Sequence, residues 1–217
     1  MTGIDPELWP IVWLTLRVTG SALALAALVG IPLGAYLGST QFRGQRLIAL
    51  LIYTAMGLPS VVVGLVVYLL LSRSGPLAIL DWLFTPQAMI VAQAIIALPV
   101  VTGITMSAVA AVPPELALQV RSLGASPWQV RRTILREARA GVAVALAAGF
   151  GRIASEVGAA LMVGGNIHGH TRVLTTAIVL ETGKGDFALA LALGGWLIGL
   201  TLLANMVVLR LQGRPMP

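Results

Sequence analysis

The chain has no cysteine, and only 10% of its 217 residues are charged. Without cysteine there is no disulfide framework, no thiolate metal site and no catalytic thiol. Soluble globular proteins carry about 25% charged residues, so this chain is too poor in charge for an ordinary soluble domain. Its first ten residues contain no base, whereas a cleavable signal peptide begins with a basic region. We therefore expect no cleavage.

Apolar sequence, in contrast, is abundant. Hydrophobic residues make up 58% of the chain, and its mean hydropathy is +0.93. In the bilayer core every backbone polar group must be bonded internally, and a spanning helix needs about 20 apolar residues. The composition therefore predicts an all-α, polytopic membrane helical bundle. Five apolar runs are long enough to span, at residues 15–37, 47–71, 88–112, 141–163 and 187–209.

A sixth crossing is conceivable at residues 172–183, "RVLTTAIVLETG". Arg172 and Glu181 favour an interfacial or re-entrant helix instead, because charges are costly in the hydrocarbon core. Thr171 is expected to cap the start of this helix and Gly183 its end.

Basic residues are spread unevenly over the two sides of these spans. One side holds nine arginines, in two loops and the C-terminal tail: Arg43, Arg46, Arg121, Arg131, Arg132, Arg136, Arg139, Arg210 and Arg214. The other side holds Arg73, Arg172 and Lys184. Cytoplasmic loops are enriched in Lys and Arg, so the nine arginines should face the cytoplasm. The net charge of +6 thus reflects topology, and no nucleic-acid partner is expected.

This orientation places the N-terminus outside and the C-terminus in the cytoplasm. The predicted organisation is an external segment at residues 1–14 and a transmembrane domain at residues 15–209. That domain carries a cytoplasmic loop at residues 113–140, and a cytoplasmic tail follows at residues 210–217.

The loop 113–140 is predicted to contain two short helices rather than irregular chain. Pro113 and Pro114 are typical of a helix start, and Gly124 of a helix end. Ser126 and Gln129 have the spacing of a capping box around a second helix. In a soluble protein such a pair could be a helix-turn-helix that reads DNA, but a loop tethered between two spans could hardly enter a major groove. Its expected partner is another protein; the alternative is a loop that only satisfies topology.

The same loop, in "LQVRSLGASPWQVRRTILREA", resembles the EAA loop of type I ABC importer permeases. Gly124 and Ile134 fit that motif's spacing. The chain departs from it at both ends, where Glu-Ala-Ala would fall on residues 118–120 and Leu-Pro on residues 136–137. The segments "GLPSVVVGLVVYLLLSRSGPL" and "SEVGAALMVGGNIHGHTRVLTTAIVLETGKGDFALALAL" resemble permeases of molybdate and tungstate importers, the tungstate branch best. The resemblance covers most of residues 15–209.

The resemblance implies a pore subunit of the bacterial or archaeal inner membrane, built as a homodimer. A separate ATPase dimer would bind ATP and Mg²⁺, and an external binding protein would deliver the oxyanion. This chain has no phosphate-binding G-x-x-x-x-G-K-[ST] loop, so no cofactor is expected in it. The residues implied to couple it to the ATPase are Arg121, Ser122, Leu123, Gly124, Ala125, Ser126 and Trp128.

Charged and helix-bending residues inside the spans are candidates for the translocation path. Arg152 and Glu156 are spaced to pair at i, i+4 on the predicted fourth span, and such a pair either braces helices or gates a pore. Pro59 and Pro99 fall in the second and third spans, where each removes a helix hydrogen bond. They are interpreted as bends that line the path or as packing kinks.

The segment "GGNIHGHTR" is expected at the outer mouth of the pore, or else is a simple surface loop. Asn166 and Thr171 offer hydrogen bonds to an oxyanion, as do Thr175 and Thr176 just beyond, and Arg172 adds positive charge. Two histidines, His168 and His170, are weak grounds for a metal site without further ligands. No catalytic residue is predicted.

Three other functions stay open at this point. The alternatives are a permease for another small solute, a secondary transporter and a polytopic membrane enzyme. A secondary transporter would need inverted repeats, and the predicted spans show no matching halves. An enzyme would need a catalytic set, but both histidines lie in one loop and the intramembrane acid has an arginine beside it.

Overall fold

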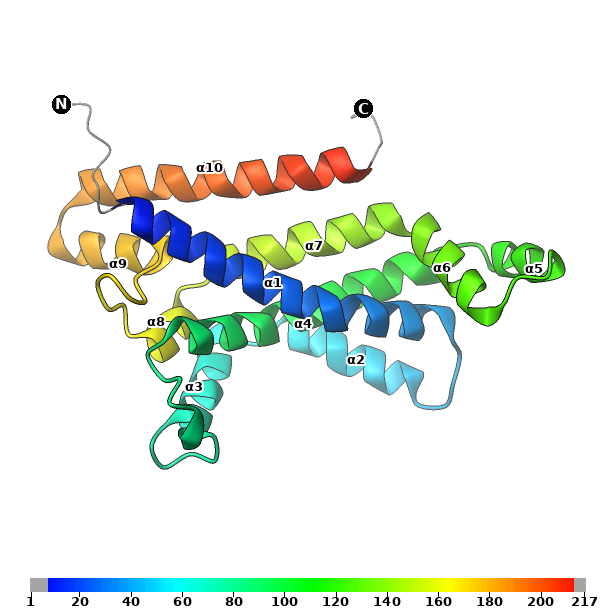
Figure 1. The fold of residues 1–217 in the computed structure, drawn as a ribbon, viewed down its shortest axis with the longest axis horizontal. Helices are drawn as coiled ribbons and strands as arrows, with labels where there is room; N and C mark the ends of the chain where they lie inside the picture. Colours follow the sequence, from blue (N-terminus) through cyan, green and yellow to red (C-terminus); the bar gives the residue numbers. More distant parts are fainter. Residues whose placement is uncertain (1–7, 213–217) are drawn as a thin grey trace.

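The computed structural model describes residues 8–212. Within that range every regular element is a helix, which confirms the all-α prediction. The elements, shown in Figure 1, are α1 (Leu8–Ser39), α2 (Gln45–Met56), α3 (Ser60–Leu71), the 3₁₀ turn η1 (Ala78–Leu80), α4 (Pro86–Ala110), α5 (Pro114–Ser122), α6 (Pro127–Glu137), α7 (Arg139–Ala154), α8 (Gly158–Gly164), α9 (Leu174–Lys184) and α10 (Phe187–Gln212).

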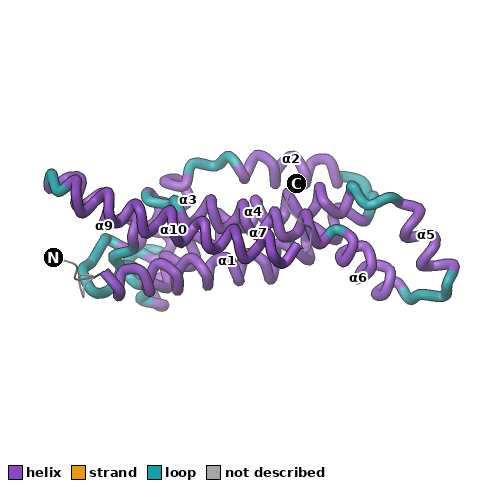
Figure 2. Tube along the Cα trace, turned by 90° about the horizontal axis from the view of Figure 1, so that it is seen from above, coloured by secondary structure: helices purple, strands orange, loops and turns teal. Residues whose placement is uncertain are grey.

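Four of these helices, α1, α4, α7 and α10, follow the long axis of the molecule (Figures 1 and 2). Helix α4 is the centre of the bundle, because it packs against α1, α2, α7 and α8. By length and composition α1, α4 and α10 are each able to cross a membrane. Two bent helix pairs raise the number of crossings to as many as five.

Helices α1 and α4 approach each other very closely along a row of glycines, Gly30, Gly34 and Gly38, spaced four residues apart on α1. A Cβ atom added to Gly34 would lie 2.6 Å from the Thr102 carbonyl oxygen, and one added to Gly38 would lie 2.5 Å from the Met106 carbonyl oxygen. Small residues of this kind let helix backbones touch in a membrane. This close pair is the scaffold on which the other helices are arranged.

The second span was predicted as one continuous helix, and this prediction is wrong. Helices α2 and α3 meet at an angle of 96° across residues 57–59, and α3 turns aside from the bundle axis (Figure 1). Pro59 starts α3 with an extended backbone, at φ −61° and ψ 124°, instead of kinking a continuous helix. The residue before a proline disfavours the helical conformation, and Gly57 already ends α2.

The predicted fourth span is also broken. Helix α7 ends at Ala154, and α8 begins at Gly158 after a bend of 60°. The Ser155 hydroxyl donates to the Gly151 carbonyl at 3.0 Å and also contacts the Arg152 carbonyl at 3.3 Å. Side-chain bonds of this kind replace the helix ladder at its end. Glu156 therefore lies in the break and not on a continuous helical face.

The sixth candidate segment forms a short helix, α9, of 11 residues. At about 1.5 Å per residue it is too short to cross a bilayer. Its predicted ends are wrong: Thr171 lies before the helix, which starts after Val173, and Gly183 lies inside it. Gly185, at φ 83°, ends the helix instead.

The two ends of the bundle differ in what they carry (Figure 1). Helices α5 and α6 lie at one end, beside the loop that joins α1 to α2. The first turns of α1, the α8–α9 loop and α9 lie at the other. Helix α10 starts at this second end and runs toward the first, so the described chain begins and finishes at different ends. Residues 1–7 and 213–217 of the predicted terminal segments lie outside the described residues.

Candidate functional site

The break between α7 and α8 contains an ion pair inside the membrane-spanning part of the chain. Arg152 Nη1 lies 3.2 Å from Glu156 Oε2, and the two side chains are 33% and 2% exposed. The predicted pairing of these residues is confirmed, although the straight helix that suggested it is not. A buried carboxylate beside a half-buried guanidinium avoids the cost of an isolated buried charge.

The Glu156 carboxylate has a second partner. Its Oε1 accepts a hydrogen bond of 2.9 Å from the Ala159 backbone N–H, in the first turn of α8. The first N–H groups of a helix have no partner within that helix, and an acidic side chain satisfies them well. Glu156 therefore both neutralises Arg152 and caps α8. Its own carbonyl accepts a bond of 2.9 Å from the Thr175 hydroxyl, which joins α9 to the same point.

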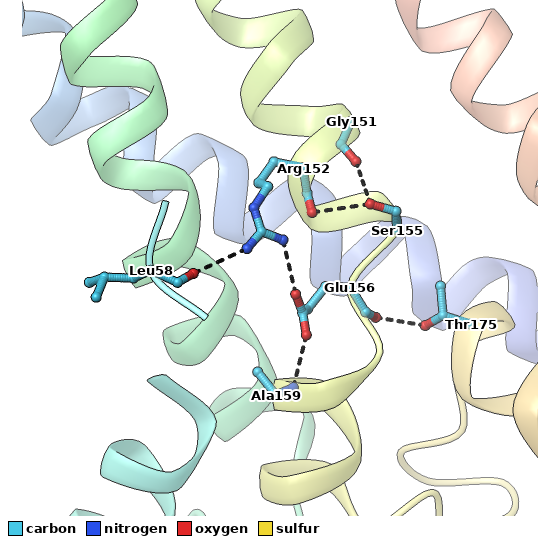
Figure 3. A network of polar contacts seen from close by, with 7 residues as sticks. All are labelled: Leu58, Gly151, Arg152, Ser155, Glu156, Ala159 and Thr175. Carbon is cyan, nitrogen blue, oxygen red and sulfur yellow. Dashed lines mark hydrogen bonds and ion pairs between the residues drawn. The ribbon is translucent and has the colours of Figure 1, made fainter. Parts of the chain in front are cut away.

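Arg152 also reaches the other broken span. Its Nη2 lies 3.5 Å from the Leu58 carbonyl oxygen, in the break between α2 and α3 (Figure 3). Close packing supports this junction, because a Cβ added to Gly64 of α3 would lie 2.7 Å from the Cα of Ala159 in α8. The two bends thus meet at one guanidinium. We call the set Leu58, Arg152, Ser155, Glu156 and Thr175 the junction network.

An apolar cavity of about 340 Å³ opens beside the junction network. Arg152, Pro99 and Thr102 are among the residues that line it, together with residues of α1 and α2. The structure therefore brings two of the predicted path residues, Pro99 and Arg152, to one cavity. Pro59 lies next to Leu58, at the edge of this set. Thr102 donates its hydroxyl to the Leu98 carbonyl at 2.7 Å.

The predicted outer-mouth residues lie together in the loop between α8 and α9. Arg172 Nε donates to the Asn166 side-chain oxygen at 3.3 Å, and Arg172 Nη2 lies 3.5 Å from the Asn166 carbonyl. Thr171 is fully buried, and its hydroxyl donates to the Gly164 carbonyl at 2.5 Å and accepts from the Ile167 N–H at 2.9 Å. In this arrangement Thr171 holds the loop in shape. Asn166 and Arg172 are half-buried, and His168 and His170 beside them are exposed.

The other two threonines predicted to face an oxyanion are also engaged within the chain. The Thr175 hydroxyl bonds to Glu156 as described, and the Thr176 hydroxyl caps α9 by contacting both the N–H and the carbonyl of Val173 at 3.1 Å. Both residues are buried. Sequence reasoning predicted hydroxyls open to an oxyanion, and it could not show that backbone groups take them up.

The helix pair α5–α6 has the local structure that the sequence predicts. The Gly124 N–H bonds to the Arg121 carbonyl at 2.9 Å and the Ala125 N–H to the Val120 carbonyl at 3.3 Å. This is a Schellman ending, with Gly124 at φ 82°. Ser126 and Gln129 form the predicted capping box, with bonds of 2.7 and 3.4 Å.

The turn between these two helices exposes two large apolar side chains. Leu123 is 86% exposed and Trp128 is 72% exposed, and Arg121, Ser122 and Ser126 beside them are exposed as well. Ala125 is half-buried behind the turn. Exposed apolar side chains rimmed by polar groups are typical of a protein interaction site. We call these residues, 121–126 together with Trp128, the α5–α6 tip.

Comparison with known proteins gives this arrangement a family. The pattern of the family described as "Binding-protein-dependent transport system inner membrane component" matches residues 30–214. The chain belongs to this family. The match includes both broken spans, the α5–α6 tip and the α8–α9 loop, so all predicted site residues fall inside it.

Two relatives are similar over almost their whole length. The tungstate uptake system permease protein TupB of Peptoclostridium acidaminophilum is 42% identical over 212 residues, covering 98% of this chain and 93% of that protein. A probable anion ABC transporter permease of Haloferax volcanii is 44% identical over 205 residues, covering 92% and 88%. The molybdenum transport system permease ModB of Escherichia coli is more distant, at 29% identity over 192 residues, 84% of this chain and 83% of that protein.

The fold also has a counterpart among solved structures. An inward-facing structure of the MetNI methionine ABC transporter has a chain that matches with a TM-score of 0.74, covering 97% of this chain and 98% of that one. The sequences are only 20% identical, so the likeness is one of fold. It confirms the type I ABC importer permease fold that the loop motif predicts.

One residue of the junction network escaped sequence reasoning. Leu58 contributes only its backbone carbonyl, and no side-chain property marks it. The signal was present in "GLPS" at residues 57–60, because a glycine and a proline two residues apart are strong helix breakers. That pattern was interpreted as a kink, and not as an end that exposes a carbonyl to a neighbouring helix.

Proposed function

We propose that this chain is the permease subunit of an ATP-driven importer that carries a tetrahedral oxyanion, tungstate or molybdate, into the cell. The observation that carries the proposal is the similarity, over almost the full length of each chain, to a tungstate permease and to an anion permease. The lower identity to a molybdenum permease favours tungstate as the first substrate to test. All these relatives are named as transport permeases, so the role of the chain is transport and not catalysis.

The proposed assembly contains two copies of this chain, an ABC ATPase dimer and an external oxyanion-binding protein. ATP and Mg²⁺ belong to the ATPase, since this chain has no phosphate-binding loop. In this assembly the end with α5 and α6 faces the cytoplasm, and the start of α1 and the α8–α9 loop face outward. The bias of arginines toward the first end supports that orientation.

The α5–α6 tip is the proposed contact with the ATPase. Its exposed leucine and tryptophan can enter an apolar groove, and the Schellman turn at Gly124 holds the two short helices at a fixed angle. Helix α5 follows α4 after three residues, and only Ala138 separates α6 from α7. Movement of the tip is therefore transmitted directly to α4 and α7, which carry Pro99 and Arg152.

The junction network is the proposed gate. Arg152 supplies the positive charge that draws an oxyanion into an apolar passage, and Glu156 keeps that charge from holding the anion too tightly. Because Arg152 touches both broken spans, a shift of α7 relative to α2 would change its partners. Pro59 and Pro99 border the same region, and Asn166, Thr171 and Arg172 form the outer approach. The alternative role of the network is to brace the two bends without moving.

The proposal is tested first by capture of the ATPase. The tagged chain is purified from detergent-solubilised native membranes, and proteins that co-purify are identified by mass spectrometry. Gly124→Arg should lose the ATPase, because it places a bulky cation in the middle of the contact. Gly185→Arg is the matched control: Gly185 has nearly the same φ, 83° against 82°, and neither glycine has an atom within 4 Å of an added Cβ.

Capture by the unmodified chain and by Gly185→Arg, together with loss in Gly124→Arg, would support the importer and its coupling site. Tungstate and molybdate uptake by cells carrying each variant then identifies the cargo. If no ATPase is captured by any intact variant, the importer assignment fails. If Gly124→Arg captures the ATPase and transports normally, the tip is not the coupling site.

A further inference from the structure

Helix α1 carries a stripe of residues that the transport proposal does not use. Trp9, Trp13 and Arg17 are spaced four residues apart and share one face of α1. Trp9 is 64% exposed and Trp13 is 60% exposed, and Arg17 is exposed as well. Within the described residues Arg17 forms no hydrogen bond or ion pair. An arginine without a partner on a spanning helix calls for an explanation, because a charge is costly in lipid.

The predicted span of residues 15–37 places Trp9 and Trp13 at the level of lipid headgroups. Helix α1 has 32 residues and is about 48 Å long at 1.5 Å per residue, whereas the hydrocarbon core is about 30 Å thick. The helix is therefore longer than the core, and with the span at residues 15–37 its first turns fall in the interface, where tryptophan is enriched. Arg17 is about 12 Å along the helix from Trp9, and its long side chain can extend back toward the headgroups.

A cavity of about 580 Å³ lies beside this stripe, between α1, the start of α4 and the α8–α9 loop. The residues that line it include Trp13, Arg17, Gln87, His170 and Arg172, and within residues 8–212 none of the lining residues is acidic. Leu14 and Ile11 add an apolar wall. The lining thus combines two guanidinium groups with apolar surface.

The second arginine also has capacity for a ligand. Among the described residues the Arg172 side chain has two long contacts, both to Asn166, of 3.3 and 3.5 Å, although a guanidinium has five N–H donors. Two arginines that face one cavity suit a tetrahedral oxyanion, because each can bind two of its oxygens. Neither Arg152 nor Glu156 lines this cavity, so it is separate from the junction network.

We infer that the cavity between Arg17 and Arg172 binds a phosphate-type oxyanion, and that at this depth the oxyanion is the headgroup phosphate of an anionic lipid. The arginines hold the phosphate oxygens, and Trp13 with Ile11 and Leu14 packs against the glycerol and upper acyl carbons. The inference does not depend on which solute the protein transports.

The test uses the purified full-length chain in detergent with phosphatidylglycerol added, and native mass spectrometry to count bound lipids. Losing a charge-assisted contact should lower the occupancy of one lipid site by about tenfold or more. Arg17→Gln should show this loss, and Arg17→Lys should retain part of the binding. Arg73→Gln is the control, because Arg73 is an exposed arginine that does not line the cavity. An unchanged size-exclusion profile verifies folding.

Titration with inorganic phosphate and with tungstate identifies the source of the oxyanion. If Arg17→Gln loses phosphatidylglycerol and neither free anion displaces the lipid from the unmodified chain, the lipid is the ligand. If free anions bind in an Arg17-dependent manner and Arg17→Gln binds as many lipids as the unmodified chain, the assignment of the oxyanion to a lipid headgroup is refuted. If Arg17→Gln changes neither lipid nor free-anion binding, the site itself is refuted.

Discussion

The α1–α4 pair and the α7–α8 break satisfy the same requirement in opposite ways. Both lie in a bilayer, where every backbone polar group needs a partner. Helices α1 and α4 meet it with helical bonds that continue through each helix apart from the donors missing at Pro32 and Pro99. The glycine row on α1 lets apolar backbones touch. At the break the helical bonds end, and Ser155, Glu156 and Thr175 take their place.

The difference indicates where movement is possible. Van der Waals contact between two backbones has one good geometry, since a shift either opens a void or causes a clash. Charged hydrogen bonds can exchange partners at little loss, provided each group finds another. We therefore propose that the α1–α4 pair is the scaffold and that the junction network is the moving part.

The largest effect should come from filling the α1–α4 contact. Gly34→Leu places a Cβ atom 2.6 Å from the Thr102 carbonyl oxygen, and the helices must separate. Overpacking of this kind should cost about 3 kcal/mol or more. The measurement is the melting temperature in detergent, followed by fluorescence-detected size exclusion. Gly20→Leu on the same helix is the control, because nothing lies within 4 Å of its added Cβ. Equal melting temperatures for the two variants would show that α1 and α4 are not a tight pair.

The sequence was informative where local chemistry decides the structure. The apolar runs predict the helical bundle, and the α5–α6 tip follows from Pro127, Gly124 and the capping box, all of which act within a few residues. The spacing of Arg152 and Glu156 also predicted their pairing, because four residues bring two side chains together whether the helix continues or just ends.

The sequence was not informative where contacts with a distant segment determine the structure. The broken spans are also long and apolar enough to cross a membrane, so the hydropathy criterion does not reveal the breaks. Glu156 lies outside the helix because its groups find partners elsewhere: its carboxylate accepts from the Ala159 N–H, and its backbone carbonyl accepts from the Thr175 hydroxyl. Thr175 is 19 residues away in the sequence. The glycine row on α1 was overlooked in the same way, since its meaning depends on where α4 lies.

Removal of the buried carboxylate should have the next largest effect. Glu156→Ala leaves Arg152 without its ion pair and the Ala159 N–H without an acceptor, at a cost of about 2 kcal/mol. Glu156→Gln keeps an oxygen for the Ala159 N–H and should cost about half as much. Melting temperature separates the two variants, and tungstate uptake reports on the gate. If Glu156→Gln folds and transports as the unmodified chain does, the network neither braces nor gates.

Arg152→Lys should have a smaller effect on stability and a distinct effect on transport. A lysine keeps the charge near Glu156 but has one nitrogen, so it cannot contact Glu156 and Leu58 in the way that two guanidinium nitrogens do. We expect a loss of about 0.5–1 kcal/mol, the range for one net hydrogen bond. Uptake should fall more than stability does if the link between the two breaks serves gating. Proportional losses in both, measured at several temperatures, would instead indicate a brace.

The smallest effect on the single chain is expected in α10, which repeats the small-residue pattern of α1 in a different setting. Gly195 and Gly199 have the same four-residue spacing as Gly34 and Gly38, but nothing lies within 4 Å of an added Cβ at either position. Gly195→Ala should therefore change the free energy of unfolding by about 0.5 kcal/mol or less. The helix preference of alanine acts toward higher stability. Melting temperature in detergent measures the change. A large drop in the melting temperature of the isolated chain would mean that glycines at this spacing stabilise a helix even where no neighbouring backbone touches them. A loss seen only in the oligomer, measured by size exclusion with light scattering, would place a second copy against this face of α10.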